Sequence, residues 1–588
     1  MWKGMARRIY GQRRLGVLVV SMMLAGCATT INMHSPITGE EPLSPDEGLV
    51  VVRVVNAGPY PLPLNQFTIL PEALNESTAI KPDRLLALDK IVDGSSVFAS
   101  TVAPGNYTVH GLRSFHTDGQ VVYQFFAAAE ISLGSFNVQP GAVTDLGTLV
   151  YYPKLQGEKY LKMVVRMPGS GDGEVLRKYF PFHTFSPDGL LGWNEDGFES
   201  EREDTFYSIL QNPAYFNQTY LAPSGSLVFL APFGVLVERS PSGEWLIDAV
   251  DTSLRLETVA ENSRGDRMVG GAEGRLFLKR AGQAWEDVSL DVGELVEHVT
   301  FFNDERIDVV TREARQVKVM SASLADEALN WEVVNRYDSL NGWEKSADAK
   351  PEVPTTTGRR TLRPRVISDT AVSEIQGKTY ISFTHELNQA MPAFVRGNMR
   401  FFSFDPDTWT MSKERDPEWD AVSEAGAVKF GIQGPGLFNW SQSNSYFREN
   451  LDGGEWERVN VSIRSCRNWV EPGEDGLCPD GVGPRNRDFS LQSIPWFATP
   501  SDGVAVAYLK GINTSKDENA SDVRLVVTED GGASWRVTEQ TVPERWCTRF
   551  VNHLPDRVLV SCNGISGDFY ESQDMGVTWE HVREHQDF

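Results

Sequence analysis

Short apolar runs separated by turn residues dominate the chain after residue 48. The run 49–55 (LVVVRVV) is continuous, and those at 107–109 and 143–150 follow Pro-Gly turns. Apolar runs of this length, bounded by Gly, Pro and Asn, are typical of strands rather than helices. We therefore predict an all-β protein that begins with a β-sandwich over residues 46–155.

The turns of this first domain carry a recognisable pattern. The Pro-Gly-x-Tyr turn at 104–107 and the segment 141–147 (GAVTDLG) resemble the carboxypeptidase-regulatory or prealbumin-like sandwich modules of exported bacterial proteins. That resemblance implies a spacer or adhesion element. Residues 156–215 are less regular and are expected to be a linker. Within it, 199–210 predicts a short helix, because its acidic start suits the helix dipole.

A repeated turn motif characterises residues 216–588. The segments 528–535 (TEDGGASW) and 572–579 (SQDMGVTW) place Asp, Gly and Trp in the same register. Both resemble the Asp-box, or BNR, repeat of the sialidase-like superfamily. We expect a structural role in which the Asp accepts turn N–H bonds, the Gly takes a positive φ and the Trp begins the next strand. The residues concerned are Asp530, Gly532 and Trp535 in one copy and Asp574, Gly576 and Trp579 in the other.

Degenerate copies upstream extend the repeat. Further tryptophans stand at positions 245, 285, 331, 409 and 456. Most of the intervals along this series are about 40–50 residues, the length of one four-stranded propeller blade. The two longer intervals contain the Pro- and Gly-rich segments 346–365 and 466–487, which are typical of insertions. We predict a β-propeller of about seven blades over 216–588. Eight or nine blades are the alternative, if the long intervals hold further sheets.

The first 26 residues have the order of a lipoprotein signal peptide. Basic residues precede the apolar run 15–25, which is shorter than the about 20 residues of a membrane span. The segment 24–27 (LAGC) resembles a lipobox, which implies cleavage before Cys27 and acylation of that residue. Residues 27–45 are then a flexible tether. Ala28, in place of Asp, implies sorting to the outer membrane in a Gram-negative cell, with the body facing either the periplasm or the exterior.

The charge of the chain restricts its partners. It has 55 basic and 80 acidic residues, and a net charge of −25. Nucleic acid is not an expected partner, because binding phosphates requires a basic face. Anionic lipid should also repel the body, so we expect the acyl group alone to hold it at a membrane. The densest basic cluster is a candidate site for an anion or an acidic partner, with a solvated loop as the alternative; it comprises Arg359, Arg360, Arg363 and Arg365.

Four cysteines follow Cys27. In an exported protein an even set predicts disulfides, and the spacings suggest two local bonds, Cys466–Cys478 and Cys547–Cys562. The chain has no Cys-x-x-Cys pair, and 385–389 (HELNQ) lacks the second histidine of a zincin. We therefore expect neither a metal site nor a cofactor.

The Asp-box resemblance raises the question of catalysis. Sialidases resemble one another in three arginines that clamp a substrate carboxylate, a Tyr/Glu pair and an acid Asp. Their first arginine belongs to an early Arg-Ile-Pro motif, whereas the first predicted blade here reads LVFLAP at 227–232. We assign no catalytic residue and expect a non-catalytic binding or scaffold lipoprotein of the bacterial cell envelope, whose propeller engages a protein or glycan. The alternative is a sialidase-like glycoside hydrolase acting on envelope or host glycans.

Overall fold

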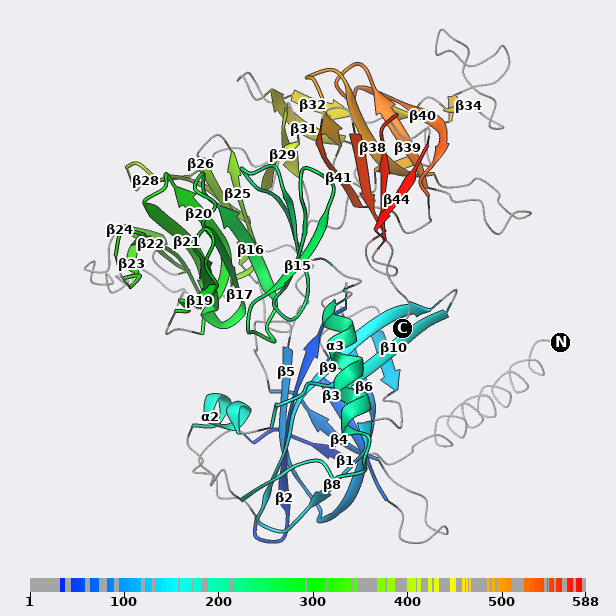
Figure 1. Ribbon diagram of the computed structural model, residues 1–588, viewed down its shortest axis with the longest axis vertical. Coiled ribbons are helices and arrows are strands. Elements are labelled where there is room, and N and C mark those ends of the chain that lie inside the picture. The colour runs from blue at the N-terminus through cyan, green and yellow to red at the C-terminus, as the bar shows by residue number, and fades with distance from the viewer. Residues whose placement is uncertain are drawn as a thin grey trace, which may run out of the picture.

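The computed structural model describes residues 32–583 with interruptions (Figure 1). Breaks of up to four residues occur throughout. The longer segments outside the description are 1–31, 38–43, 59–63, 73–81, 89–94, 182–188, 346–366, 386–398, 414–420, 433–444, 451–456, 467–483, 510–522, 563–567 and 584–588.

Two sheets pack face to face in the N-terminal lobe (Figure 1). Sheet A has the order β1-β4-β3-β6-β7 with β8 paired to β6, and sheet B has the order β10-β9-β2-β5 with β11 paired to β9. Their shared core includes Val52 of β2 and Phe67 of β3. The strands are β1 (Asn32–His34), β2 (Gly48–Asn56), β3 (Gln66–Pro71), β4 (Asp83–Leu86), β5 (Ser95–Val102), β6 (Gly105–Thr117), β7 (Val122–Ala128), β8 (Ser135–Val138), β9 (Val143–Gln156), β10 (Lys159–Arg166) and β11 (Leu190–Leu191).

The sandwich extends beyond its predicted limits in both directions. β10 pairs antiparallel with β9 from Lys159 to Arg166, so part of the predicted linker belongs to sheet B. β1 lies within the predicted tether and pairs in parallel with β4. This strand forms because β4 presents an edge to it, and because Asp83 accepts hydrogen bonds from Asn32 and His34 at 2.9 and 3.0 Å.

Two helices cover the outer face of sheet B. α2 (Glu174–Tyr179) packs over one end of the sheet. α3 (Glu199–Gln211), close to the helix predicted from the sequence, packs over the other end. The layers therefore run from sheet A through sheet B to the helices. No helix among the described residues has the length and apolarity needed to cross a membrane.

Seven successive antiparallel sheets follow in the described part of the chain. The third has a fifth strand, and in the sixth both β36 and β37 pair with β38, while β33 pairs in parallel with β40. This confirms the predicted class, a sandwich followed by a propeller of about seven blades. The blades are β12 (Gln218–Leu221), β13 (Leu227–Leu230), β14 (Val235–Arg239), β15 (Trp245–Ala249); β16 (Leu256–Glu261), β17 (Arg267–Gly271), β18 (Leu276–Lys279), β19 (Trp285–Asp287); β20 (Leu295–Phe302), β21 (Arg306–Glu313), β22 (Gln316–Ser323), β23 (Glu332–Asp338), β24 (Gly342–Lys345); β25 (Ile367–Ile375), β26 (Lys378–His385), β27 (Met399–Asp405), β28 (Thr410–Lys413); β29 (Ala421–Ala425), β30 (Val428–Ile432), β31 (Ser445–Asn450), β32 (Glu457–Asn460); β36 (Phe489–Leu491), β37 (Trp496–Phe497), β38 (Gly503–Leu509), β39 (Val523–Thr528), β40 (Ser534–Thr541); and β41 (Arg549–Leu554), β42 (Arg557–Ser561), β43 (Phe569–Ser572), β44 (Glu580–Arg583). Smaller elements are η3 (Ala272–Gly274), β33 (Ser462–Ile463), β34 (Ser465–Cys466) and β35 (Pro484–Arg485).

The tryptophans of the repeat stand at the start of the fourth strand of a blade. Trp245 and Trp285 are the first residues of β15 and β19, and Trp535 is the second of β40. Trp331 and Trp579 directly precede β23 and β44. The remaining two, at 409 and 456, lie outside the described residues and precede β28 and β32 in the sequence. Within the described residues, each of the two long intervals between tryptophans, 331–409 and 456–535, corresponds to one blade with long connections.

The first blade packs against the seventh and closes the ring. Trp245 Nε1 donates a hydrogen bond to the Val582 carbonyl at 2.9 Å, and the Trp245 ring lies 5.0 Å from that of Phe569. Trp285 Nε1 likewise donates to Asp248 Oδ2 of the first blade at 3.0 Å. In both cases the indole at the head of a fourth strand binds the preceding blade.

The sandwich and the propeller share an apolar contact. Phe206 of α3 lies 5.6 Å from Phe233, which belongs to the turn between β13 and β14. Both side chains join a buried cluster with Val55 and Tyr152 of sheet B. Phe233 has a φ of 61°, a region that disfavours side chains other than glycine, so the packing offsets some backbone strain.

Polar contacts reinforce this junction. Arg53 Nη1 of β2 donates a hydrogen bond to Ser253 Oγ of the propeller at 3.3 Å. Lys178 and Tyr179 of α2 both contact the Glu273 carboxylate in η3. The sandwich is therefore attached at the first two blades through both apolar and charged groups.

Candidate functional site

The strand order gives the propeller two distinct edges. In each blade, the turns that join the first strand to the second and the third strand to the fourth lie at one edge of the propeller. This edge carries the Asp-box turns, and we call it the Asp-box edge. The turns that join the second strand to the third, and the segments that join one blade to the next, lie at the opposite edge. Phe233, Ser253 and Glu273 meet the sandwich there, so we call it the sandwich edge.

The two complete Asp-box turns share one hydrogen-bond network. Asp530 Oδ1 accepts bonds from the Ser534 N–H at 2.8 Å and the Thr528 hydroxyl at 2.9 Å, and Oδ2 accepts from the Ser534 hydroxyl at 2.6 Å. Asp574 accepts the corresponding three bonds from Thr578 and Ser572 at 2.8, 2.7 and 2.8 Å. Each carboxylate thus holds the two ends of its turn together.

The environment of Asp530 stabilises its charged form. Burial alone would raise the pKa of Asp530, but the hydrogen bonds from Ser534 and Thr528 outweigh it and lower the pKa. Gly531 and Gly532 have φ values of 71° and 88°, which the tight turn requires. Trp535 follows with its side chain 3% exposed. The geometry is that of a structural turn.

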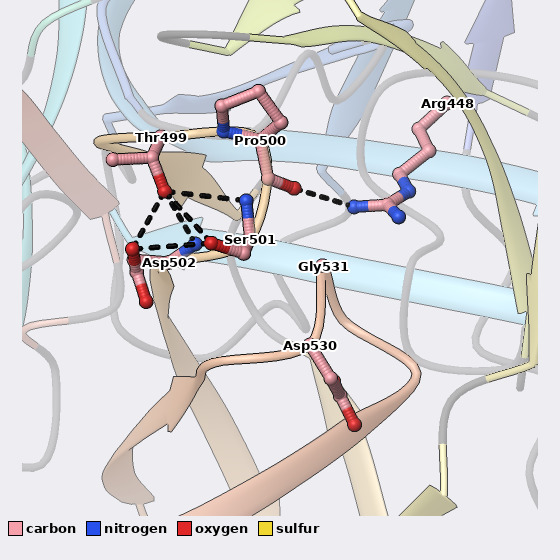
Figure 2. Close-up of a pocket in the computed structure, with 7 residues that line it drawn as sticks. All are labelled: Arg448, Thr499, Pro500, Ser501, Asp502, Asp530 and Gly531. Atoms are coloured by element: carbon pink, nitrogen blue, oxygen red, sulfur yellow. Dashed lines mark hydrogen bonds between the residues drawn. The ribbon is translucent and has the colours of Figure 1, made fainter.

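A polar hollow of about 580 Å³ opens on the Asp-box edge between the fifth and sixth blades (Figure 2). Arg448 of β31 forms one side, and the Asp-box turn contributes Asp530 and Gly531. The turn between β37 and β38 forms the other side. The lining residues are Arg448, Thr499, Pro500, Ser501, Asp502, Asp530 and Gly531.

The hollow places a cation opposite an anion. Arg448 Nη1 donates a hydrogen bond to the Pro500 carbonyl at 2.8 Å. Asp502 Oδ2 accepts bonds from the hydroxyls of Thr499 and Ser501 at 2.6 and 3.2 Å (Figure 2). A β-carbon at Gly531 would collide with the Arg448 guanidinium, so the glycine makes room for it. Guanidinium, hydroxyl and carboxylate groups together suit sugar hydroxyls or a peptide main chain.

A second charged cluster lies near the axis of the ring. First strands of consecutive blades contact one another, as β16 and β20 do, so these strands surround the axis. Glu257 of β16 and Glu297 of β20 each occupy a β-bulge in a first strand. Arg255 pairs with Glu257 at 2.9 Å, and Arg312 pairs with Glu297. Bulges redirect side chains, and the charge of the Glu297 carboxylate acts on Glu257.

This cluster changes the acidity of Glu257. Burial raises the pKa of Glu257 to about 7, and the nearby Glu297 carboxylate adds to the effect while Arg255 and Arg312 oppose it. The Glu257 side chain is 19% exposed. A carboxyl group with a pKa near neutrality can both donate and accept a proton at physiological pH. In the same strand as Glu297, burial lowers the pKa of His298 to about 4, which keeps that ring neutral.

Three of the four cysteines predicted to pair lie within the described residues. Cys547 and Cys562 form a disulfide, as predicted. Cys547 precedes β41 and Cys562 ends the following hairpin, so the bond closes that hairpin at the sandwich edge. Cys466 belongs to β34, whereas Cys478 lies outside the described residues.

Other predicted site residues fall outside the description. They are Cys27, Gly576 and the cluster Arg359, Arg360, Arg363 and Arg365. Within the described residues, no group of three or more His, Cys, Asp or Glu side chains is arranged to hold a metal ion.

Apart from Asp530, which the Asp-box motif predicted, sequence reasoning missed the residues of both clusters. Arg448 belongs to no motif, and it reaches the hollow only because β31 ends beside the sixth blade. Glu257 and Glu297 left a weak signal. Each lies within three residues of the start of the first strand of its blade, so aligning the blades by strand would have paired them.

Comparisons with known proteins assign this chain to no family. No family matches the sequence, and no curated protein matches it. Solved propellers are similar to the chain. They include YCF48 bound to the D1 peptide, with TM-score 0.34, 10% identity and coverage of 59% of this chain and 90% of that chain. The Cps50 (Swd1) propeller of Myceliophteria thermophila has TM-score 0.32, 11% identity and coverage of 59% and 93%. A PL25 polysaccharide lyase, an ulvan lyase bound to -[GlcA(1-4)Rha3S]-, has TM-score 0.33, 13% identity and coverage of 60% and 90%. These likenesses concern the fold alone.

Proposed function

We propose that the protein is a non-catalytic lipoprotein of the bacterial cell envelope that binds a protein or glycan partner at the Asp-box edge of its propeller. The observation that carries this proposal is the different use of the two edges. The sandwich is attached to one edge through Phe233, Ser253 and Glu273, while the polar hollow opens on the other. A partner held in the hollow would therefore bind away from the sandwich.

The anchoring part of the proposal rests on the N-terminal sequence. A basic segment, an apolar run and the lipobox ending at Cys27 occur in that order, and Ala28 favours the outer membrane. Acyl labelling in cells tests it. The wild-type protein should incorporate labelled fatty acid, and Cys27→Ser should not. A labelled Cys27→Ser protein would contradict the assignment of Cys27.

The binding part is tested by a photo-crosslinking residue at Ser501, which lines the hollow. We expect one discrete adduct in envelope preparations, and its loss when Arg448→Glu reverses the charge beside it. A crosslinker at Ser242, an exposed residue on the same edge of the first blade, is the matched control. Equal adducts from both positions, or an adduct that survives Arg448→Glu, would contradict binding in the hollow.

A glycoside hydrolase is the second candidate, and one observation favours it. Glu257 and Glu297 both belong to first strands near the propeller axis and interact electrostatically, and the pKa of Glu257 is about 7, which suits a general acid. Paired carboxylates of this kind cleave glycosidic bonds in many enzymes. Hydrolysis of envelope glycans that both Glu257→Gln and Glu297→Gln abolish, and that Arg448→Glu leaves unchanged, would establish this function in place of the first.

A further inference from the structure

The outer face of sheet A carries an unusual set of side chains for such an acidic protein. Phe67, Leu85 and Leu112 point into the sandwich core, so the residues next to them in each strand point outwards. Across β1, β4, β3, β6 and β7 these outward residues include Met33, Arg84, Thr68, Arg113 and Phe126, which we call the sheet A stripe.

Strand register places the stripe in two adjacent rows on this face. Met33 pairs with Arg84, and Arg84 pairs with Thr68. Arg113 pairs with Phe126, and its guanidinium lies 4.6 Å from the centre of that ring. The Phe126 ring also lies over Gly111, the residue opposite Thr68, where a β-carbon would approach it to 2.7 Å. The two arginines thus lie between apolar side chains, Met33 on one side of the face and Phe126 on the other.

The two arginines lack acidic partners within the described residues. No salt bridge there involves Arg84 or Arg113, although most other arginines of the described chain are paired with a carboxylate. Burial lowers the pKa of Arg84, and the positive charge of Arg113 lowers it further, so the two guanidinium groups repel each other. Two neighbouring cations without a counter-ion form a site that an anion would stabilise.

The stripe also presents an apolar side chain to solvent. Met33 is 51% exposed. Phosphate oxygens would satisfy the arginines, while an apolar phase would accept the methionine.

The position of β1 indicates the source of this ligand. Asn32, the first described residue, is five residues after Cys27. Five residues span at most about 18 Å even when fully extended. If Cys27 is acylated, as the proposed function requires, the membrane surface therefore lies within this distance of the stripe. The propeller is attached beyond sheet B, on the opposite side of the sandwich.

We propose that the sheet A stripe docks on the phospholipid surface beside the anchor, with Arg84 and Arg113 binding headgroup phosphates and Met33 entering the interface. The acidic remainder of the protein then faces away from the membrane. The stripe is the one surface of the described chain that we expect anionic lipid to attract. The inference rests on the proposed anchoring for its geometry, but it can be tested without the acyl group.

The test is vesicle flotation with the mature chain from residue 28, which contains every described residue. We expect binding to vesicles that contain phosphatidylglycerol, weaker binding to phosphatidylcholine alone, and release by salt. Arg84→Gln with Arg113→Gln should weaken binding roughly 30-fold, because each cation near an anionic surface contributes about 1 kcal/mol. The same substitutions at Arg264 and Arg536, whose side chains are 49% and 69% exposed on the propeller, are the matched control.

Three further comparisons complete the experiment. Arg84→Lys with Arg113→Lys should retain most of the binding, which excludes misfolding as the cause of any loss. Inorganic phosphate should release the protein no better than sodium chloride of equal ionic strength. Equal binding to both vesicle types, equal loss in the control pair, or specific competition by inorganic phosphate would overturn the proposal. A failure of acyl labelling at Cys27 would overturn the anchoring instead, so the two failures are distinguishable.

Discussion

Glu257 shows how one backbone irregularity changes the chemistry of a side chain. The residue occupies a bulge in β16, where burial raises its pKa and the charge of Glu297 adds to the effect. Neither the burial of Glu257 nor its interaction with Glu297 can be predicted from the sequence, because both depend on how two neighbouring blades pack together. The Asp-box residues differ, since Asp530 is bonded within its own turn and a local motif predicted them.

Glu257 should make stability depend on pH. Its pKa rises from 4.5 to about 7 on folding, so in this range the native state holds a proton that the unfolded state has lost. The free energy of unfolding should therefore fall as the pH rises through this window. Glu257→Gln should flatten the dependence, and denaturant titrations at several pH values will show it. An unchanged slope in the variant would contradict the assignment.

Asp530→Ala should open its turn. The variant loses three hydrogen bonds to a charged acceptor, and we expect unfolding to become easier by about 1–3 kcal/mol. Because the native pKa is lowered, the stabilisation is present at neutral pH and is lost as the pH falls below about 4. Wild type and variant should therefore converge in acid. The neighbouring Glu529→Ala, whose side chain is 80% exposed, should have little effect at any pH.

At the level of strands, the sequence predicts the structure best in the propeller, where a similar turn motif recurs along the chain. The tryptophans at the heads of the fourth strands were found from the Asp-box motif, its degenerate copies and their spacing, because this pattern recurs along the chain. β1 and β10 were missed for the opposite reason. Their partners are β4 and β9 of the sandwich, and no periodicity in β1 or the linker indicates which edge is open.

Trp245 tests how the blades hold together. Trp245→Phe keeps an aromatic ring against Phe569 but leaves the Val582 carbonyl without its donor, which should cost about 1 kcal/mol. Trp245→Ala also leaves a cavity and should cost about 3 kcal/mol or more. Thermal unfolding measures both. Leu246→Ala, on the same strand with its residue 56% exposed, should change the melting temperature little. A similar loss from Leu246→Ala would contradict the role of the indole.

The hairpin of β41 and β42 depends on its disulfide. Peptide mapping without reduction should recover Cys547 linked to Cys562, which are 15 residues apart. Replacing both by serine should lower the free energy of unfolding by about 3 kcal/mol, since a loop of this size is no longer closed in the unfolded chain. Free thiols at both positions in protein purified under oxidising conditions would refute the bond.

For the molecule as a whole, Phe206 couples the two lobes. Phe206→Ala removes its contact with Phe233 while leaving each core in place, so calorimetry should resolve two unfolding transitions where the wild type shows one. Tyr207→Ala, on the same helix and 50% exposed, is the control and should leave a single transition. A single transition in both variants would mean that the polar contacts are enough to couple the unfolding of the two lobes.

Closure of the ring has a consequence for how the molecule is made. The hydrogen bond that completes it joins Trp245 to Val582, 337 residues later. During synthesis the aromatic surface of the first blade therefore stays uncovered until nearly the last strand has emerged. A chain truncated before β42 would lack Leu559 and Phe569 and would leave that surface uncovered. The surface around Phe229 and Trp245 is therefore where we expect a chaperone to bind the nascent chain.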